Sequence, residues 1–138
     1  MLIEIKEKKT IKNSKDISQI LRTILNSECH IDQDKEHFWV VGFNCRNVIK
    51  YIELVSLGTL SSTLTHPREI FRRAIMQAAC SIIVAHNHPS EDPTPSNDDI
   101  EITKKVKKSG EILGIKLLDS LVITKDNYIS LIEKSIVE

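Results

Sequence analysis

The sequence has no excess of charge of either sign. Its 19 lysine and arginine residues equal its 19 aspartate and glutamate residues, so net charge gives no support for broad attraction to nucleic acid or to anionic lipid. It also lacks a long apolar run, because the longest weakly polar stretch, Ala74 to Pro89, contains Gln77 and the polar segment 86–88 and is too short to span a bilayer. We therefore expect no membrane insertion. A net charge of zero does not exclude a local basic patch.

Cysteine is scarce and without pattern. Cys29, Cys45 and Cys80 are odd in number, widely spaced and form no CxxC pair. The first six residues carry charge where a secretory signal needs an apolar run, and together these features favour a reduced, cytoplasmic location. A chain of 138 residues with 41% apolar and 28% charged residues fits one soluble globular domain whose core is large enough without disulfides.

The hydrophobic pattern predicts helices that alternate with strands around an early hairpin, which is typical of a single-domain α/β fold with a mixed sheet flanked by helices. Residues 1–12, rich in lysine, form an amino-terminal lead-in or edge strand, and residues 13–138 form the domain. The first half should contain a helix from Ser14 as N-cap, a polar linker over 29–35, a hairpin of strands 38–43 and 48–57, and a loop at 61–63. The second half should contain a helix over 67–79, a central strand over 80–85, a helix over 96–113, and strands over 115–124 and 128–132. The residues expected to face inward are Ile70, Phe71, Ala74 and Ile75 on the helix over 67–79, and Ile102, Val106 and Leu113 on the helix over 96–113.

The most informative segment follows the predicted central strand. His86 and His88 share one face of an extended segment because strand side chains alternate with period two. A proline-containing turn leads to Ser96 and Asp99, where a helix begins. Two imidazoles and one carboxylate make a three-ligand zinc site with an open fourth position, which is the arrangement of a catalytic site.

Other interpretations of these residues stay open on spacing alone. Ser96 and Asp99 match the capping box, in which the third helical residue bonds back to the N-cap amide, and two histidines at a strand end are often only solvated. Asp98 is the competing carboxylate, but one residue along a helix turns a side chain by about 100°. The conjunction of HxHP with a serine and an aspartate at this spacing favours His86, His88 and Asp99 as metal ligands.

A catalytic zinc site also needs a group that moves a proton from the metal-bound water to the leaving group. By position, Glu36, just before the predicted strand 38–43, is the strongest candidate. An exposed linker residue beside Asp34 and Lys35 explains it equally well, and spacing alone does not exclude Glu69 or Glu91.

The segment HNHPSEDPTPSNDD (86–99), with the preceding strand and the PREIFRRAI helix (67–75), resembles the RadC-like family of bacterial proteins. That family belongs to the JAMM/MPN+ metalloprotease class, whose motif is a glutamate, then HxHP, then S-x-x-D. The resemblance covers about residues 30–135 and implies a JAMM-like sandwich of the cytidine-deaminase-like kind. It implies one Zn²⁺ per chain bound by His86, His88 and Asp99, with Glu36 as general acid/base and Ser96 as hydrogen-bond donor to the tetrahedral intermediate. One departure is Glu91, where the family typically has glycine.

The function expected from this resemblance is zinc-dependent hydrolysis of an amide bond in a peptide or protein substrate, as a metallopeptidase or isopeptidase. The alternative is a non-catalytic module associated with DNA, since the family carries a historical DNA-repair label and its full-length members usually have an amino-terminal helix-hairpin-helix module. We expect a stand-alone domain here, because the segment before Glu36 has no hairpin glycine signature. The basic cluster of Lys104, Lys105, Lys107 and Lys108 could meet phosphates, but such lysines are usually solvated.

Overall fold

A computed structural model describes residues 1–3, 13–58 and 65–137. Six strands form one mixed sheet in the order β1-β3-β2-β4-β5-β6. All neighbouring strands are antiparallel except β4 and β5, which are parallel and are joined by a crossover through helix α4. The strands are β1 (Leu2–Ile3), β2 (His37–Phe43), β3 (Ile49–Leu57), β4 (Ser81–Asn87), β5 (Lys116–Ile123) and β6 (Tyr128–Ser130). The predicted mixed sheet flanked by helices is confirmed.

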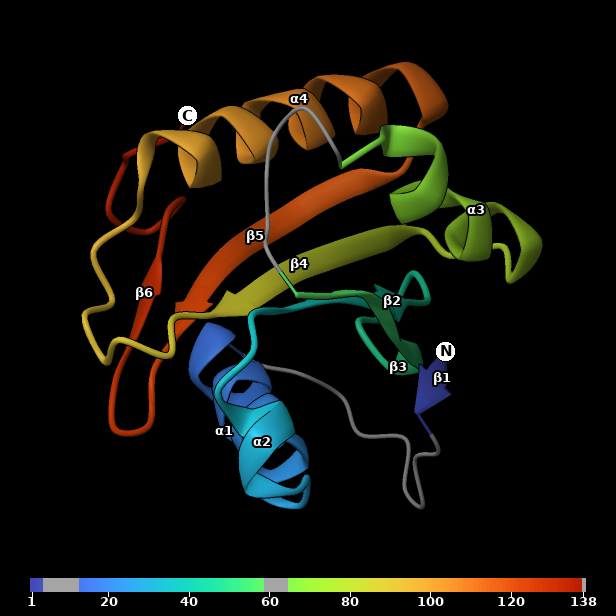
Figure 1. The fold of residues 1–138 in the computed structure, drawn as a ribbon. Helices are drawn as coiled ribbons and strands as arrows, with labels where there is room; N and C mark the ends of the chain where they lie inside the picture. The colour runs from blue at the N-terminus through green and yellow to red at the C-terminus, as the bar shows by residue number, and fades with distance from the viewer. Residues whose placement is uncertain (4–12, 59–64, 138) are drawn as a thin grey trace.

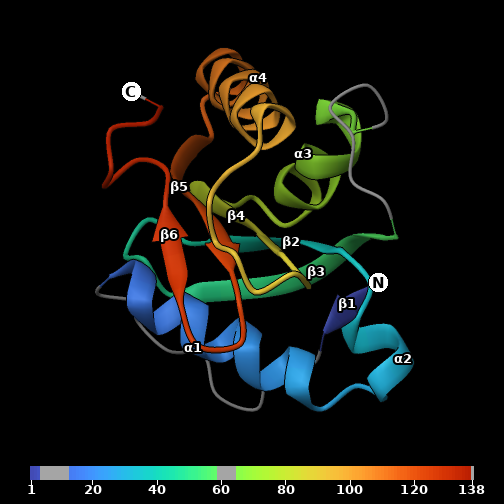
Figure 2. The ribbon, with the colours of Figure 1, turned by 60° about the vertical axis from the view of Figure 1, so that its left-hand side comes forward.

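Helices cover both faces of this sheet (Figure 1). Helices α3 (Pro67–Met76) and α4 (Asn97–Leu113) lie on one face, and α1 (Ser14–Asn26) with the short α2 (His30–Gln33) lies on the other. Figure 2 shows the same two layers from the side, with the sheet between them. No described helix is long and apolar enough to cross a membrane.

Apolar side chains of the central strands alternate between the two faces of the sheet and so contribute to a hydrophobic core on each face. Phe38 and Val40 of β2 face α3 and α4, whereas Trp39 and Val41 face α1. Strand β4 alternates in the same way, because its even-numbered apolar residues join the first core and its odd-numbered ones join the second. A central strand that is buried on both faces is almost wholly apolar, and this explains why the segment before His86 contains so little polar sequence.

The positions of the helices and strands follow the predictions closely, with corrections at the helix ends. The N-cap of α1 is Asn13, whose side chain accepts from the Asp16 amide, and Ser14 is the first helical residue. The expected polar linker contains α2, and the expected helix over 67–79 ends at Met76. The loop expected at 61–63 lies outside the described residues, as do residues 4–12 of the lead-in; Leu2–Ile3 pairs with β3.

Two apolar residues expected to face inward do not. Ile75 is 58% exposed, since it lies about 100° around the helix from the fully buried Ala74, and Leu113 is 47% exposed at the last residue of α4. Helix α4 continues through Gly110 and ends before Gly114, whose φ of 74° is the left-handed conformation that glycine adopts most readily. Gly110 is buried where α4 approaches Ile115, and a Cβ at that position would lie 2.3 Å from the Ile115 carbonyl oxygen.

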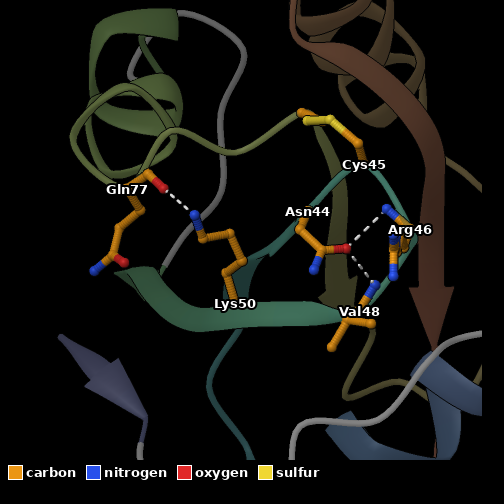
Figure 3. The surroundings of a disulfide bond; sticks show 7 residues. Asn44, Cys45, Arg46, Val48, Lys50 and Gln77 are labelled. Atoms are coloured by element: carbon orange, nitrogen blue, oxygen red, sulfur yellow. Dashed lines mark hydrogen bonds between the residues drawn. A yellow bond between two sulfur atoms is a disulfide. The ribbon is translucent and has the colours of Figure 1, made fainter.

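One end of the β2–β4 pair is closed by a disulfide between Cys45 and Cys80, whose Cα atoms are 5.2 Å apart (Figure 3). Cys45 lies in the turn after β2, and Cys80 directly precedes β4, so the antiparallel pairing of these strands brings the two together. In the same turn, Asn44 Oδ1 accepts from the Arg46 and Val48 amides at 2.8 and 3.0 Å. Two of the three widely spaced cysteines are therefore paired.

A buried carboxylate joins the first helix to the last two strands. Asp119 of β5, only 3% exposed, accepts hydrogen bonds from the hydroxyls of Ser14 and Ser130 and from the Ser120 amide. These donors satisfy the buried carboxyl oxygens, which would otherwise lack hydrogen-bond partners. Asp119 thus fixes the start of α1 against β5 and β6.

Candidate metal centre

The opposite end of β4 presents two imidazoles to the α4 side of the sheet. His86 continues the even-numbered alternation of Ile82 and Val84, so its side chain points toward α4 and is 3% exposed. His88 follows the strand, and its backbone amide donates to the Ile123 carbonyl of β5 at 2.9 Å. The backbone that carries both histidines is therefore held by the sheet.

Helix α4 begins at this same end and supplies a carboxylate. Ser96 is its N-cap: the Ser96 hydroxyl accepts from the Asp99 amide at 3.1 Å, and the Ser96 amide donates to Asp99 Oδ2 at 2.8 Å. The capping box considered from sequence is thus present, and it coexists with the ligand geometry. Capping fixes the Asp99 rotamer, and Asp99 is 5% exposed and faces the two histidines.

Three donor atoms converge on one point. His86 Nε2 lies 3.0 Å from Asp99 Oδ1, His88 Nε2 lies 2.9 Å from Asp99 Oδ2, and the two Nε2 atoms are 3.1 Å apart. Tetrahedral zinc with bonds of about 2.0–2.1 Å has ligand atoms roughly 3.3 Å apart, so a small outward shift of these side chains accommodates the ion. Within the described ranges, His86, His88 and Asp99 form the single group of such residues that could hold a metal ion.

Hydrogen bonding selects the nitrogen that His88 offers. Its Nδ1 lies 2.9 Å from the Asp92 carbonyl oxygen, which can only accept, so Nδ1 carries a proton and Nε2 is the atom that faces the site. A carbonyl that fixes the tautomer of a histidine in this way is the usual partner of a metal-ligating imidazole. The proline-containing turn after His88 therefore also orients the ring.

The three side chains shift one another's pKa. Burial disfavours the charged form of Asp99, but hydrogen bonds with His86 and His88 outweigh it and hold the pKa of this carboxyl well below its usual range. The hydrogen bond to Asp99 raises the pKa of His88, while burial opposes the rise. Asp99 is consequently ionised at physiological pH, as a metal ligand must be, and a cation that binds at His88 displaces a proton.

A cleft of about 710 Å³ opens beside this group, and Glu36 and Ser96 line it together with His88 and Asp99. Glu36 directly precedes β2 and has the same parity as Phe38, so it belongs to the α4 side of the sheet. Because Phe38 pairs with His86 in the β2–β4 ladder, extending the register by two residues places Glu36 opposite His88. The structure thus brings all five residues expected from the sequence to one place.

The three competing carboxylates are outside the group formed by His86, His88 and Asp99. Asp98 lines the cleft but is exposed and is outside the donor group. Glu69 is on α3 and forms an ion pair with Arg72. Glu91 accepts from the Lys125 amide at 2.9 Å, and its φ of 67° is the left-handed conformation that explains the glycine typical of the resembled family at this position.

Two residues near Glu36 were not predicted from the sequence. Asn87, 2% exposed, bonds to the backbone on both sides of Glu36, and the Gly58 amide donates to the Glu36 carbonyl at 2.8 Å. Alternation offered a signal for Asn87, because a residue between two histidines of one face must point to the other face. Gly58 had no such signal, since its contact depends on the pairing of β2 with β3.

The mixed sheet and the convergent histidines and aspartate define an α/β domain of the JAB/MPN-like class. A sequence model of the RadC-like JAB domain family matches residues 11–136, and the chain belongs to this family. It is 53% identical over 100 residues to a UPF0758 protein of Caldanaerobacter subterraneus, 50% over 102 residues to one of Clostridium novyi and 47% over 103 residues to one of Geobacillus kaustophilus. These matches cover 72%, 74% and 75% of this chain and 43%, 45% and 46% of the relatives, so the chain spans less than half of their length.

Proposed function

We propose that this domain is a zinc-dependent hydrolase of the JAMM type that cleaves an amide bond in a peptide or protein, as a metallopeptidase or isopeptidase. The observation that carries the proposal is the convergence of His86, His88 and Asp99 beside a cleft that Glu36 and Ser96 also line. Two imidazole nitrogens and one carboxylate oxygen leave room for a water and a substrate oxygen, which is the donor set of catalytic zinc sites.

The residues of the chain divide the chemistry between them. A zinc ion bound at this site would lower the pKa of a water toward about 7 and polarise the substrate carbonyl. Glu36 accepts the proton of the attacking water and then delivers it to the departing amine, the role of a general acid/base. The Ser96 hydroxyl uses a lone pair to cap α4, so its proton stays available to the carbonyl oxygen as negative charge develops there.

The charges on the surface give the DNA-associated alternative little support. Lys104 lies 3.9 Å from Glu101, and Lys105 Nζ donates to the Thr65 carbonyl at 3.3 Å. The balanced net charge points the same way. Strong retention on an oligonucleotide resin at moderate salt would reverse this preference.

The proposal is tested first by metal content and then by turnover. Elemental analysis should find one zinc per wild-type chain, and His88→Ala and Asp99→Ala should each weaken zinc binding by more than the roughly 10–100-fold that outer-shell changes cost. Asp98→Asn is the matched control, since this neighbouring carboxylate is outside the donor group, and it should keep its zinc.

A screen of internally quenched peptides and isopeptide-linked peptides then follows on the zinc-loaded protein. Glu36→Gln should retain zinc and lose turnover by about 10²–10⁴-fold, the usual contribution of a general acid/base. A wild-type protein that takes up no zinc, or a Glu36→Gln variant that retains zinc and full turnover of an identified substrate, would overturn the proposal.

A further inference from the structure

Asn87 stands between the two candidate metal ligands in the chain but faces the other side of the sheet. It is 2% exposed and lies next to the segment that leads into β2. The His37 amide donates to Asn87 Oδ1 at 2.5 Å, and Asn87 Nδ2 donates to the Lys35 carbonyl at 3.1 Å. One side-chain amide therefore bridges the backbone groups immediately before and after Glu36.

The chemistry of the partners fixes the orientation of this amide. The His37 backbone N–H can only donate, so it must meet the oxygen of Asn87, and the Lys35 carbonyl can only accept, so it must meet the nitrogen. A flipped amide would face a donor with a donor and an acceptor with an acceptor. Aspartate at this position would offer acceptors alone, and alanine would offer neither group.

Other bonds restrain the same segment. The Glu36 carbonyl accepts from the Gly58 amide at 2.8 Å. The buried His37 ring has its Nδ1 2.8 Å from the Lys35 carbonyl and its Nε2 2.5 Å from Glu28 Oε2, and it stacks on Trp39 with ring centroids 5.1 Å apart. The segment around Glu36 is thus held by Gly58, just after β3, by Asn87 of β4 and, through the His37 ring, by Glu28, just after α1.

We infer that Asn87 is a positioning residue for Glu36: by bridging the Lys35 carbonyl and the His37 amide, it holds the Glu36 carboxylate in register with His86 and His88. The inference rests on the proposed role of Glu36. Because Asn87 lies between His86 and His88 at the end of β4, a shift of this segment would move the base together with the candidate ligands. A displacement of about 1 Å between such groups costs on the order of 10²-fold in rate.

Three variants separate this role from general stabilisation. Asn87→Ala removes both bonds, and Asn87→Asp keeps the shape of the side chain and the acceptor for His37 but loses the donor to Lys35. Asn44→Ala is the matched control: Asn44 also bonds to two backbone groups, the Arg46 and Val48 amides, at the opposite end of β2. Asn87→Asp also keeps the test decisive if the alanine variant does not fold.

The first readout needs no substrate. Hydrogen exchange measured by NMR should show the His37 amide exchanging at least about tenfold faster in Asn87→Ala, and the order parameter of the Glu36 amide should fall from about 0.85 toward 0.6 in both Asn87 variants. In Asn44→Ala the Arg46 and Val48 amides should lose protection while His37 keeps it. Zinc content should be unchanged in all three variants, since neither asparagine is a ligand.

The second readout uses the peptide that the screen identifies. Both Asn87 variants should lose roughly 10–100-fold in kcat with KM within about twofold, and Asn44→Ala should match the wild type in both. Unchanged exchange and order parameters in the Asn87 variants, or a kcat equal to that of Asn44→Ala, would overturn the inference. If the wild type cleaves no peptide, the proposed function fails, and the exchange data still decide whether Asn87 holds the Glu36 segment.

Discussion

The two ends of the β2–β4 pair are both tied down, but by different means. At one end, a disulfide joins Cys45 to Cys80, and Asn44 bonds to two amides of its own turn. At the other end, Asn87 bonds across to the segment around Glu36, and the donor atoms of His86, His88 and Asp99 converge. The contacts at the first end cross-link the turn after β2 to the start of β4 and stabilise that turn. The contacts at the second end lie beside a cleft that is open to solvent.

The two ends of this strand pair are therefore expected to serve different purposes, one the stability of the fold and the other the chemistry of the site. Contacts at the disulfide end should contribute to the free energy of unfolding and leave metal binding untouched. Contacts at the cleft end should affect binding and turnover, with smaller consequences for stability.

The largest expected loss of stability comes from the disulfide end. A cross-link that closes a loop across 35 residues contributes about 3–4 kcal/mol in the chain-entropy description. The Cys45→Ser, Cys80→Ser double variant should lose that free energy in urea unfolding without reductant and should keep its zinc. Cys29→Ser, at an exposed free thiol, is the control and should unfold like the wild type.

Thiol counting gives the same prediction a second test. The native unreduced protein should react at one thiol, that of Cys29, and three thiols should react after reduction and unfolding. Three reactive thiols in freshly isolated native protein would contradict the pairing and agree with the reduced compartment expected from the sequence.

An intermediate effect is expected at the far end of α4. Gly110→Ala gains up to about 1 kcal/mol of helix propensity, but its Cβ would press on the Ile115 carbonyl, which is backbone and cannot rotate away. The net result should be a loss of about 1–3 kcal/mol, as for other overpacked sites, with zinc content unchanged. Ser109→Ala, one residue earlier, should change stability by less than about 0.5 kcal/mol; an alanine at 110 that stabilises the protein would show that α4 does not approach Ile115 so closely.

The smallest effect on stability, about 1 kcal/mol, is expected for Ser96→Ala, which removes the N-cap of α4. Ser96→Gly should lose only a few tenths of a kcal/mol, because glycine is itself a tolerated N-cap. Both variants lack the hydroxyl, so both should lose turnover equally, by roughly 10²–10³-fold if the hydroxyl stabilises developing charge. Turnover that instead follows stability, with glycine close to wild type, would assign Ser96 to capping alone.

The sequence predicts the grouping of the two histidines and the aspartate well because its information is local. His86, His88 and Asp99 lie within 14 residues, and a strand followed by a short turn and a helix start leaves few ways to arrange them. The alternation of β2 and β4 likewise follows from apolar residues at known spacing. Glu36 required the resemblance as well, because it is 50 residues from His86 and its place depends on the β2–β4 register.

What the sequence does not reveal depends on contacts between distant segments. The Cys45–Cys80 pair has no local signature and becomes visible only once β2 and β4 are known to be antiparallel neighbours. Asn87 bonds to the His37 amide and the Lys35 carbonyl, which lie 50 and 52 residues earlier in the chain. Asn13, not Ser14, caps α1, since the Ser14 hydroxyl donates to Asp119, which comes 105 residues later.

That last hydrogen bond also bears on how the chain folds. The partner of the Ser14 hydroxyl, Asp119 of β5, lies 105 residues later in the chain, and Asp119 also accepts a hydrogen bond from Ser130 of β6. Contacts of such separation form late, because the entropy of closing the intervening chain must be overcome before they contribute. Helix α1 is therefore the element expected to dock last, after the sheet it covers has been assembled.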